Sequence, residues 1–342
     1  MLPAEKYRVV RERAAIVDRS ARGKIVVAGD DRAKYLHAML TNDIVALKAG
    51  TGCYAAYLTP NGRMIADVCV YELGDVCLLD LHPSVKGAVL GELDRFVFSE
   101  DVRLGDVTET FGCFGVYGPM AAHVLVDALG GSERGAVPPA VELGALAPFQ
   151  NRRAQFSGES AIIVAAGRSG AVGFEIYIER RHAGDLGHAL ERAGGVPVDD
   201  AVMDAVRIEA GIPAFTIDMG QETIPLEAGI ERDAISFTKG CYPGQEIIIR
   251  IVHRGHGRVA KKLVGLLVQG EDVPDPGDRL FSEDREVGRV TSAAYSPALL
   301  SPIALGYVER ELQAPGTPLA LAHRDARLQA VVGALPFVAP SR

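Results

Sequence analysis

Residues 52–81, GCYAAYLTPNGRMIADVCVYELGDVCLLDL, carry the clearest folding signal in this chain. Three apolar runs, rich in Val, Tyr, Cys and Leu, are separated by the sequences PNG and GD. Both separators are hairpin turn sequences, and the runs between them have the length and composition of β-strands. The stretch therefore predicts three consecutive antiparallel strands joined by tight turns.

Helical and strand patterns alternate on either side of these strands. Apolar residues at helical spacing predict helices, and Asp30 or Asp31 is placed to cap the second of them. The predicted helices cover 5–18, 30–44, 83–97, 119–129, 181–194 and 199–212, and a strand hairpin covers 160–166 and 173–179. The chain up to about residue 255 is therefore predicted to be a mixed α+β body.

The pattern changes near residue 256. Short apolar runs broken by Gly, Pro and Asp follow one another at 261–270, 278–282, 286–296, 302–310 and 317–322. Closely spaced short strands indicate a small all-β domain, and we predict a β-barrel. The chain is expected to divide into a body, residues 1–255, and a barrel domain, residues 256–342.

Composition and charge narrow the class of protein. The 342 residues are 48% hydrophobic and 23% charged, with a formal net charge of −8, as in an ordinary globular protein. No apolar run approaches the ~20 residues of a membrane helix, and the N-terminus lacks a signal-peptide core, so we predict a cytoplasmic protein without membrane contact. The acidic charge disfavours a direct nucleic-acid partner.

The five cysteines differ in their surroundings. Cys53, Cys69, Cys77 and Cys113 lie in apolar runs, where a cysteine behaves as a small buried hydrophobe, whereas Cys241 lies among polar residues. The count is odd and there is no CxxC pair, which argues against a disulfide framework and against a self-contained metal centre. We therefore predict no metal site of the protein's own.

The polar cysteine belongs to the segment KGCYPGQE, residues 239–246. Its glycines and proline indicate a tight loop, followed by a strand or helix at EIIIR. The Lys239 charge would favour a thiolate at Cys241, which makes a redox or transfer thiol one reading. Loop packing is a second reading, and metal ligation together with His253 or His256 is a third.

Carboxylates and an arginine in two other segments are further candidates. Asp67 stands inside an apolar strand, so it must face a polar cavity, find a partner, or point outward from an edge strand. Arg207 and Glu209 are two positions apart on a helix and face different directions, and Asp218 follows in a loop. These residues form either a solvated helix end or a polar wall for a heteroaromatic ligand. A carboxylate can accept hydrogen bonds from the paired N–H donors of such a ligand.

Four segments together resemble the aminomethyltransferase-like superfamily, which includes the glycine-cleavage T-protein. In chain order they are YLHAMLTNDIVALKAGTGCYAAYLTPNGRMIADVCVY, GFEIYI, RIEAGIPAFTIDMGQETIPLEAGI and EVGRVTSAAYSPALLSPIALGYV. The resemblance covers nearly the whole chain. It implies an α+β, three-lobed ring with a C-terminal β-barrel and a central channel for tetrahydrofolate.

Within this superfamily, KGCYPGQE is similar to the signature of the YgfZ branch. T-proteins usually lack the Cys and Tyr of that loop and carry paired acids where this chain has Ala66 and Asp67. The resemblance implies a folate-binding protein that supports iron–sulfur cluster assembly or repair and, indirectly, tRNA modification. Its expected partners are a folate and iron–sulfur client or assembly proteins. The alternative is a tetrahydrofolate-dependent aminomethyltransferase.

The resemblance also assigns roles to individual residues. Glu175, Arg207, Glu209 and Asp218 would line or support the folate pocket. The residues expected to carry chemistry are Cys241 and Lys239 of the signature loop and Asp67 near the folate nitrogen. We further infer that Arg250, with Arg254, meets the folate glutamate tail or an anionic group of a partner, because arginine pairs with carboxylates in a bidentate manner.

Overall fold

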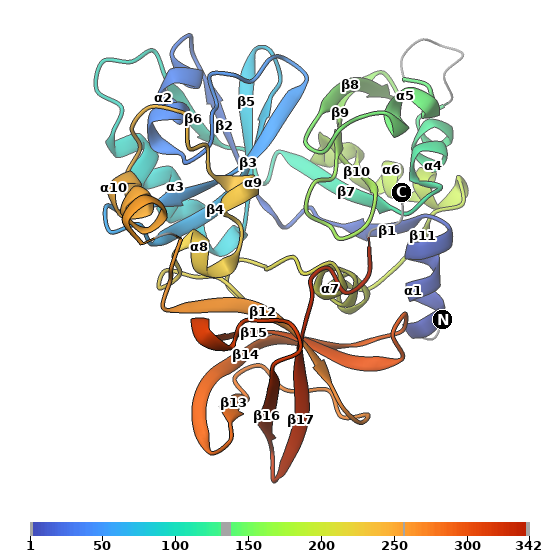
Figure 1. Ribbon diagram of the computed structural model, residues 1–342. Coiled ribbons are helices and arrows are strands. Elements are labelled where there is room, and N and C mark those ends of the chain that lie inside the picture. The colour runs from blue at the N-terminus through green and yellow to red at the C-terminus, as the bar shows by residue number, and fades with distance from the viewer. Residues whose placement is uncertain (1–2, 131–137, 256, 340–342) are drawn as a thin grey trace.

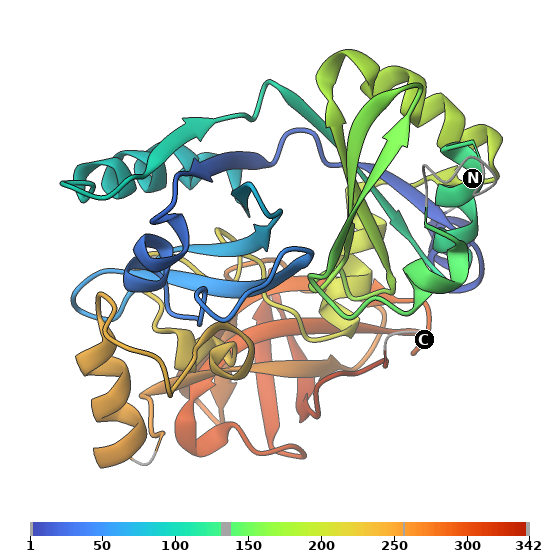
Figure 2. The same ribbon diagram turned by 90° about the horizontal axis from the view of Figure 1, so that it is seen from above.

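The computed structural model shows three lobes, two of them side by side and the third below both in the view of Figure 1 (Figures 1 and 2). It describes residues 3–130, 138–255 and 257–339. Two lobes are built on β-sheets flanked by helices, and the third is a closed barrel. The predicted α+β class and the predicted barrel are both confirmed. Within the described ranges, no helix has the length and apolar character needed to cross a membrane.

The first lobe contains a five-stranded sheet in the order β3-β4-β5-β2-β6. Its elements are β2 (Gly23–Ala28), α2 (Arg32–Met39), β3 (Thr51–Leu58), β4 (Met64–Glu72), β5 (Val76–Leu81), α3 (Pro83–Arg95) and β6 (Arg103–Asp106). The predicted meander of residues 52–81 forms β3, β4 and β5, all antiparallel. Gly62 adopts φ +72° in its first turn, where a Cβ would meet Ile247 at 3.0 Å.

The strand β4 is buried in an alternating manner that decides what faces the centre. Ala66, Val68 and Val70 pack into the lobe's core, whereas Asp67 and Cys69 between them are half-buried on the opposite face. Because side chains alternate along a strand, a single run of sequence supplies both core and cavity residues. The sheet order places β4 between β3 and β5, so Asp67 does not lie on an edge strand.

The second lobe contains a six-stranded sheet in the order β11-β1-β7-β10-β9-β8. Its elements are α1 (Pro3–Glu12), β1 (Ala15–Asp18), β7 (Phe111–Tyr117), α4 (Ala121–Ala128), α5 (Ala140–Gly144), β8 (Asn151–Phe156), β9 (Glu159–Ala165), β10 (Gly173–Glu179), η2 (Arg180–His182), α6 (Ala183–Arg192) and β11 (Val196–Pro197). The strands β9 and β10 pair as the predicted hairpin, and only the β1–β11 pair is parallel in this sheet.

A helical segment leads from the second lobe back to the first and then to the barrel. It contains α7 (Asp200–Glu209), α8 (Pro225–Ala228), α9 (Glu231–Ala234), α10 (Gln245–Ile249) and η3 (Arg250–Arg254). The barrel is formed by β12 (Lys261–Val268), β13 (Arg279–Ser282), β14 (Arg285–Ser296), β15 (Ser301–Glu309), β16 (Pro318–His323) and β17 (Ala326–Gly333), with η4 (Arg310–Leu312) between β15 and β16. The predicted boundary at residues 255–256 falls at His256, which lies outside the described residues.

Two local predictions are corrected by the structure, and one that was left open is decided. The helix expected over 5–18 ends at Glu12, because Ala15–Asp18 is β1 and pairs with β7 and β11. This pairing across the chain outweighs the local helical spacing. EIIIR, left open as strand or helix, is helical. Asp31 occupies the N-cap of α2, but its carboxylate accepts from the Asp101 amide (3.1 Å) instead of capping the helix.

Two buried carboxylates join the barrel to the rest of the molecule. Glu209, at the end of α7, accepts hydrogen bonds from Tyr7 Oη (2.7 Å) and Arg11 of α1 and from Ser296 Oγ of β14 (2.5 Å). Asp218 accepts from Ser292 Oγ of β14 (2.7 Å) and pairs with Arg207. Unpaired carboxylates are costly to bury, so these bonds hold the joint in one arrangement.

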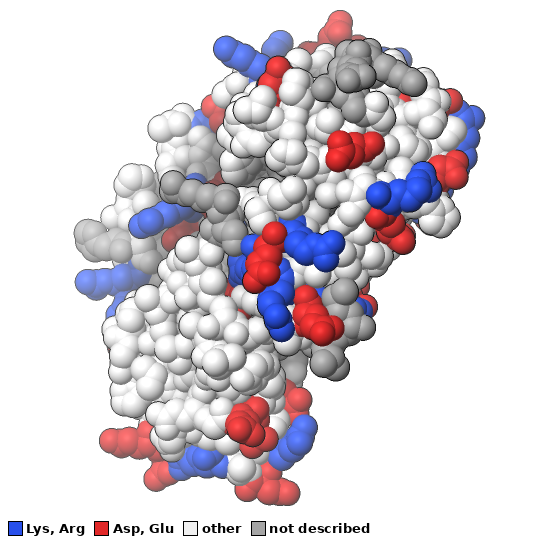
Figure 3. Space-filling view, turned by 90° about the vertical axis from the view of Figure 1, so that its right-hand side faces the viewer, with Lys and Arg blue, Asp and Glu red and all other residues white. Residues whose placement is uncertain are grey.

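Surface charge is mixed on the face seen from the α1 side (Figure 3). Lys and Arg side chains lie among Asp and Glu side chains there, and a cluster containing both signs stands near its centre. Neighbouring opposite charges partly cancel one another's field.

Replacing the carboxylate of Glu209 tests the joint between α1, α7 and the barrel. Glu209→Gln leaves Arg11, whose side chain is only 12% exposed, without its counter-charge. We expect the free energy of unfolding in urea to fall by about 3 kcal/mol. Glu191→Gln, on the exposed surface of α6, is the control and should change it by less than about 0.5 kcal/mol. Equal effects of the two substitutions would contradict a structural role for Glu209.

Candidate functional site

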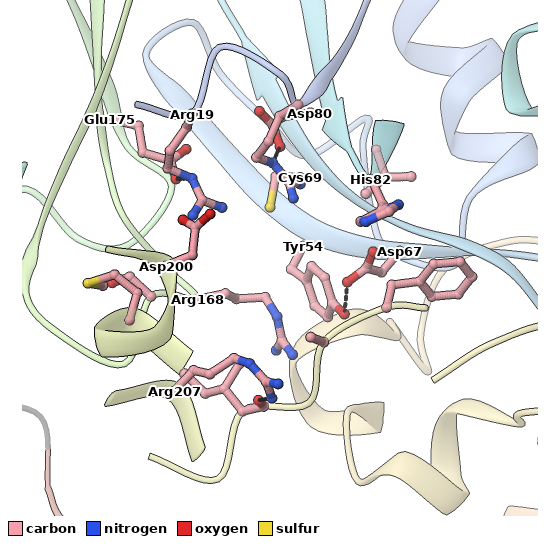
Figure 4. Close-up of a pocket in the computed structure, with 18 of the residues that line it drawn as sticks. Arg19, Tyr54, Asp67, Cys69, Asp80, His82, Arg168, Glu175, Asp200 and Arg207 are labelled. Atoms are coloured by element: carbon pink, nitrogen blue, oxygen red, sulfur yellow. Dashed lines mark hydrogen bonds and ion pairs between the residues drawn. The ribbon is translucent and has the colours of Figure 1, made fainter. Parts of the chain in front are cut away.

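A cavity of about 440 Å³ lies between the two sheets and the segment that begins with α7 (Figure 4). Tyrosines, arginines and carboxylates from all three parts converge on it. Its charged lining includes Arg19, Arg22, Asp67, Asp80, Arg168, Glu175, Asp200 and Arg207, and His82 also lines it. Ligand sites are concave and combine apolar surface with a few fixed polar groups, and this cavity is the candidate site on both grounds.

One wall of the cavity is a hydrogen-bonded network around Asp80 and Glu175. Asp80 is paired with Arg22, and Glu175 lies 3.2 Å from Arg19 Nε. Tyr177 Oη lies 2.9 Å from Asp80 Oδ2 and 3.1 Å from Glu175 Oε2. Burial raises the pKa of the Tyr177 hydroxyl well above its usual value, so the hydroxyl stays protonated. Its one O–H donates a hydrogen bond to one of the two carboxylates at a time. Each of the two carboxylates therefore already has an arginine as its counter-charge and is held in place by hydrogen bonds.

The sheet that carries Asp80 also presents, from β4, a carboxylate with fewer partners, Asp67. Tyr54 Oη donates to Asp67 Oδ2 at 2.9 Å, and the Asp67 side chain makes no other hydrogen bond within the described residues. Burial raises the pKa of Tyr54, which therefore remains a donor. The guanidinium of Arg168 lies 3.9 Å from the centre of the Tyr54 ring and donates to the Pro213 carbonyl (3.2 Å). Asp67 thus keeps acceptor capacity directed at the cavity.

His82 stands on the rim as a neutral group. Its Nδ1 accepts from the Ser84 amide at the start of α3 (3.3 Å), and its Nε2 lies 3.4 Å from Thr216 Oγ1. Burial, with the nearby Arg22 charge, lowers the pKa of His82 below its usual value. The imidazole is therefore uncharged at neutral pH, and because its Nδ1 accepts a hydrogen bond, its Nε2 carries the proton and can donate one.

Of the residues predicted from the sequence to bind the cofactor or, for Asp67, to carry chemistry, some line the cavity and others lie behind its wall. Asp67, Glu175 and Arg207 line the cavity directly. Glu209 and Asp218 are fully or almost fully buried in the barrel joint behind it. Asp218 also accepts from the Ala214 amide (2.9 Å), so it shapes the loop that closes the cavity. This arrangement separates residues placed to contact a ligand from residues placed to support the wall.

The residues predicted in the signature loop lie outside the cavity lining. Lys239 is buried, and its Nζ donates to the carbonyls of His37 and Leu40 (the latter at 2.5 Å), which anchors the loop to the end of α2. Burial lowers the pKa of Lys239 to about 8. Cys241 is exposed, and Arg250 is an exposed residue paired with Glu246 at 2.8 Å. Their assigned roles stay predictions.

Sequence analysis missed Tyr54 and Arg168. A signal for Tyr54 existed, because the PNG hairpin pairs Ala56 with Asp67 and Tyr54 with Cys69, which makes Tyr54 and Asp67 diagonal neighbours on one face. Arg168 lies in the loop between β9 and β10, where no periodicity predicts the direction of a side chain. Only the folded chain brings it over Tyr54.

Comparison with known proteins agrees with this architecture. Residues 3–239 match the model of the GCVT N-terminal domain, and residues 261–339 match the glycine cleavage T-protein C-terminal barrel domain. The chain belongs to the glycine cleavage T-protein family. This confirms the predicted superfamily.

Individual relatives cover most of the chain. An aminomethyltransferase of Streptomyces coelicolor is 30% identical over 92% of this chain and 83% of its own length. An aminomethyltransferase of Rubrobacter xylanophilus is 29% identical over 90% of this chain and 79% of its own length. The crystal structure of the glycine cleavage system aminomethyltransferase T from Bartonella henselae has a TM-score of 0.87 at 24% identity, covering 98% of this chain and 89% of that one. The last comparison confirms the T-protein fold.

The cysteines give a direct test of the signature loop. Burial raises the pKa of the Cys53, Cys69, Cys77 and Cys113 thiols, whereas Cys241 is exposed. Since the thiolate is the reactive form, the folded protein at pH 8 should take up one iodoacetamide per chain by intact mass spectrometry. Cys241→Ser should take up none, and urea-unfolded protein should take up five. Labelling of a strand cysteine before Cys241 would contradict this prediction.

Proposed function

We propose that this T-protein family member binds a reduced folate, tetrahydrofolate or a derivative, in the central cavity. The observation that carries the proposal is the Asp67 carboxylate. It makes one hydrogen bond within the described residues and faces a cavity of about 440 Å³. A pterin presents paired N–H donors along one edge, and a carboxylate accepts such pairs. The volume lies in the range of cavities that enclose ligands of this size.

A second polar group supports a ligand in the same place. Arg207 uses Nε and Nη1 on Asp204 and Asp218, while its Nη2 is buried and has no hydrogen-bond partner among the described residues. An unsatisfied buried donor costs about 1–3 kcal/mol, more when it is charged. An acceptor atom on a bound ligand would offset this cost, which favours occupancy of the cavity.

Folate binding is tested by calorimetric titration with folinic acid. We expect Asp67→Asn to weaken binding by about tenfold or more, because loss of a charged acceptor costs about 1.5–3 kcal/mol. Tyr54→Phe should have a smaller effect, since it removes a positioning bond. Asp185→Asn, on the exposed surface of α6, is the control and should leave the affinity unchanged. Absence of both heat and a thermal shift would leave a scaffold that binds partners without folate.

We further propose that the folate-bound protein acts in the cytoplasm as a YgfZ-type factor that supports assembly or repair of iron–sulfur clusters on client enzymes. The supporting feature is the KGCYPGQE loop. Lys239 anchors this loop from within, while Cys241 beside it is exposed. A thiol presented on an anchored surface loop is accessible to another protein. Any effect on tRNA modification would then be indirect.

Complementation tests the role of Cys241. Cys241→Ala removes an exposed side chain, so it should keep the wild-type melting temperature and folinic acid affinity. We expect it to lose the ability to restore iron–sulfur enzyme activity in a strain lacking the gene for the corresponding protein. Cys53→Ala, at a half-buried strand cysteine, is the matched control and should restore it. Full rescue by Cys241→Ala would remove this thiol from the mechanism.

Aminomethyl transfer to tetrahydrofolate is the second candidate function. It is favoured by the Asp67 carboxylate inside the cavity and by relatives named aminomethyltransferase. In this reading Asp67 lies near the folate nitrogen that receives the one-carbon unit. The assay is formation of methylenetetrahydrofolate from an aminomethylated lipoyl carrier protein. Robust turnover that disappears in Asp67→Asn would replace the non-enzymatic proposal.

A further inference from the structure

A second cavity, of about 250 Å³, lies between the two sheets, separate from the central one. Tyr177 lines it, and the Tyr177 hydroxyl reaches Asp80 and Glu175, which line the central cavity. We refer to it as the inter-sheet cavity. Neither the family assignment nor the proposed folate site involves it.

The wall of the inter-sheet cavity is largely apolar and incompletely covered. Half-buried apolar side chains from both lobes contribute to it, namely Val26, Leu73, Val76, Val107, Phe111 and Ile162. Apolar surface that remains wet between two sheets gains stability when an apolar group covers it. The wall therefore suits a small hydrophobic ring or chain.

The polar lining of the same cavity is acidic. It includes Asp75, Glu159 and Glu179, against a single cation, Arg153, which is already paired with Asp75 at 2.5 Å. Glu159 and Glu179 offer carboxylate oxygens within 4.8 Å of each other and of a His182 ring nitrogen. The excess of negative charge favours a cationic occupant.

Arg181 shows that a cation fits between these two carboxylates. Its Nη2 lies 3.1 Å from Glu159 Oε1 and 2.9 Å from Glu179 Oε2, and its Nε donates to His182 Nε2 at 2.9 Å. The Arg181 side chain is 63% exposed. Exposed ion pairs of this kind contribute little to stability, so a ligand cation can displace the guanidinium at small cost.

We propose that the inter-sheet cavity binds a small amphipathic amine. The apolar part of the ligand covers the wall formed by Val26, Val76 and Ile162, and its ammonium group replaces Arg181 between Glu159 and Glu179. A neutral ligand of the same shape would gain the apolar contacts alone. The amine is therefore distinguished by its charge, and the proposal does not depend on folate binding.

The experiment compares 2-phenylethylamine with its neutral analogue 2-phenylethanol, by NMR titration of the full chain without folate. We expect the amine to bind at least tenfold more tightly. Glu179→Gln should remove that advantage, whereas Arg181→Ala should strengthen amine binding three- to tenfold by vacating the carboxylates. Glu142→Gln, exposed on α5, is the control and should change neither affinity. Ile162→Phe and, independently, Val76→Leu should weaken both ligands by filling the cavity.

Several outcomes would overturn the proposal. Equal affinities for the amine and the alcohol would show that charge plays no part, and absence of any saturable shift would exclude the site. Weaker amine binding in Arg181→Ala would place the ammonium elsewhere. Binding of Mn²⁺ but not of the amine by Arg181→Ala would identify Glu159, Glu179 and His182 as a metal site instead. Glu179→Gln and Arg181→Ala change partly exposed side chains, so both variants are expected to fold.

Discussion

The arrangement of this protein depends on two buried carboxylates that hold the barrel against the two sheets. Glu209 ties α7 to α1 and β14, and Asp218 ties the following loop to Arg207 and β14. A buried carboxylate is tolerated only when donors surround it, so donors from two segments meet at Glu209 and donors from three meet at Asp218. The same bonds shape the loop at Ala214 that closes the central cavity. Stability and site geometry therefore have a common origin.

The short segment Arg207–Ile208–Glu209 shows how neighbouring residues acquire separate tasks. On a helix, positions two apart point in different directions. Arg207 faces the cavity, and Glu209 faces the joint with α1 and the barrel. Tyr177 plays a comparable double part, because it lines the inter-sheet cavity while its hydroxyl steadies the carboxylates of the central one. The inter-sheet cavity thus shares a wall residue with the network that supports the central cavity.

The signature loop and the central cavity are distinct parts of the molecule. Lys239 is a buried anchor whose ammonium group bonds two carbonyls near the end of α2, and Cys241 faces solvent. Arg250 is paired with Glu246 on the surface and is absent from the cavity lining, which makes an anionic partner a better match for it than a bound folate. Small-molecule binding and partner contact are accordingly proposed for different surfaces.

Sequence by itself determined the elements whose signals are local. Hairpin turns located β3–β5, short punctuated strands predicted the barrel, and four ordered segments indicated the superfamily. Tertiary structure decided whatever depends on distant partners. Residues 15–18 form a strand because they pair with β7 and β11. Arg168 reaches the Tyr54 ring only because its loop folds over that residue. Likewise, Glu209 and Asp67 are both carboxylates in apolar surroundings. Long-range packing placed Glu209 in the joint with the barrel and Asp67 in the cavity. The residue type determines that each carboxylate needs donors, and the topology of the chain determines which donors it meets.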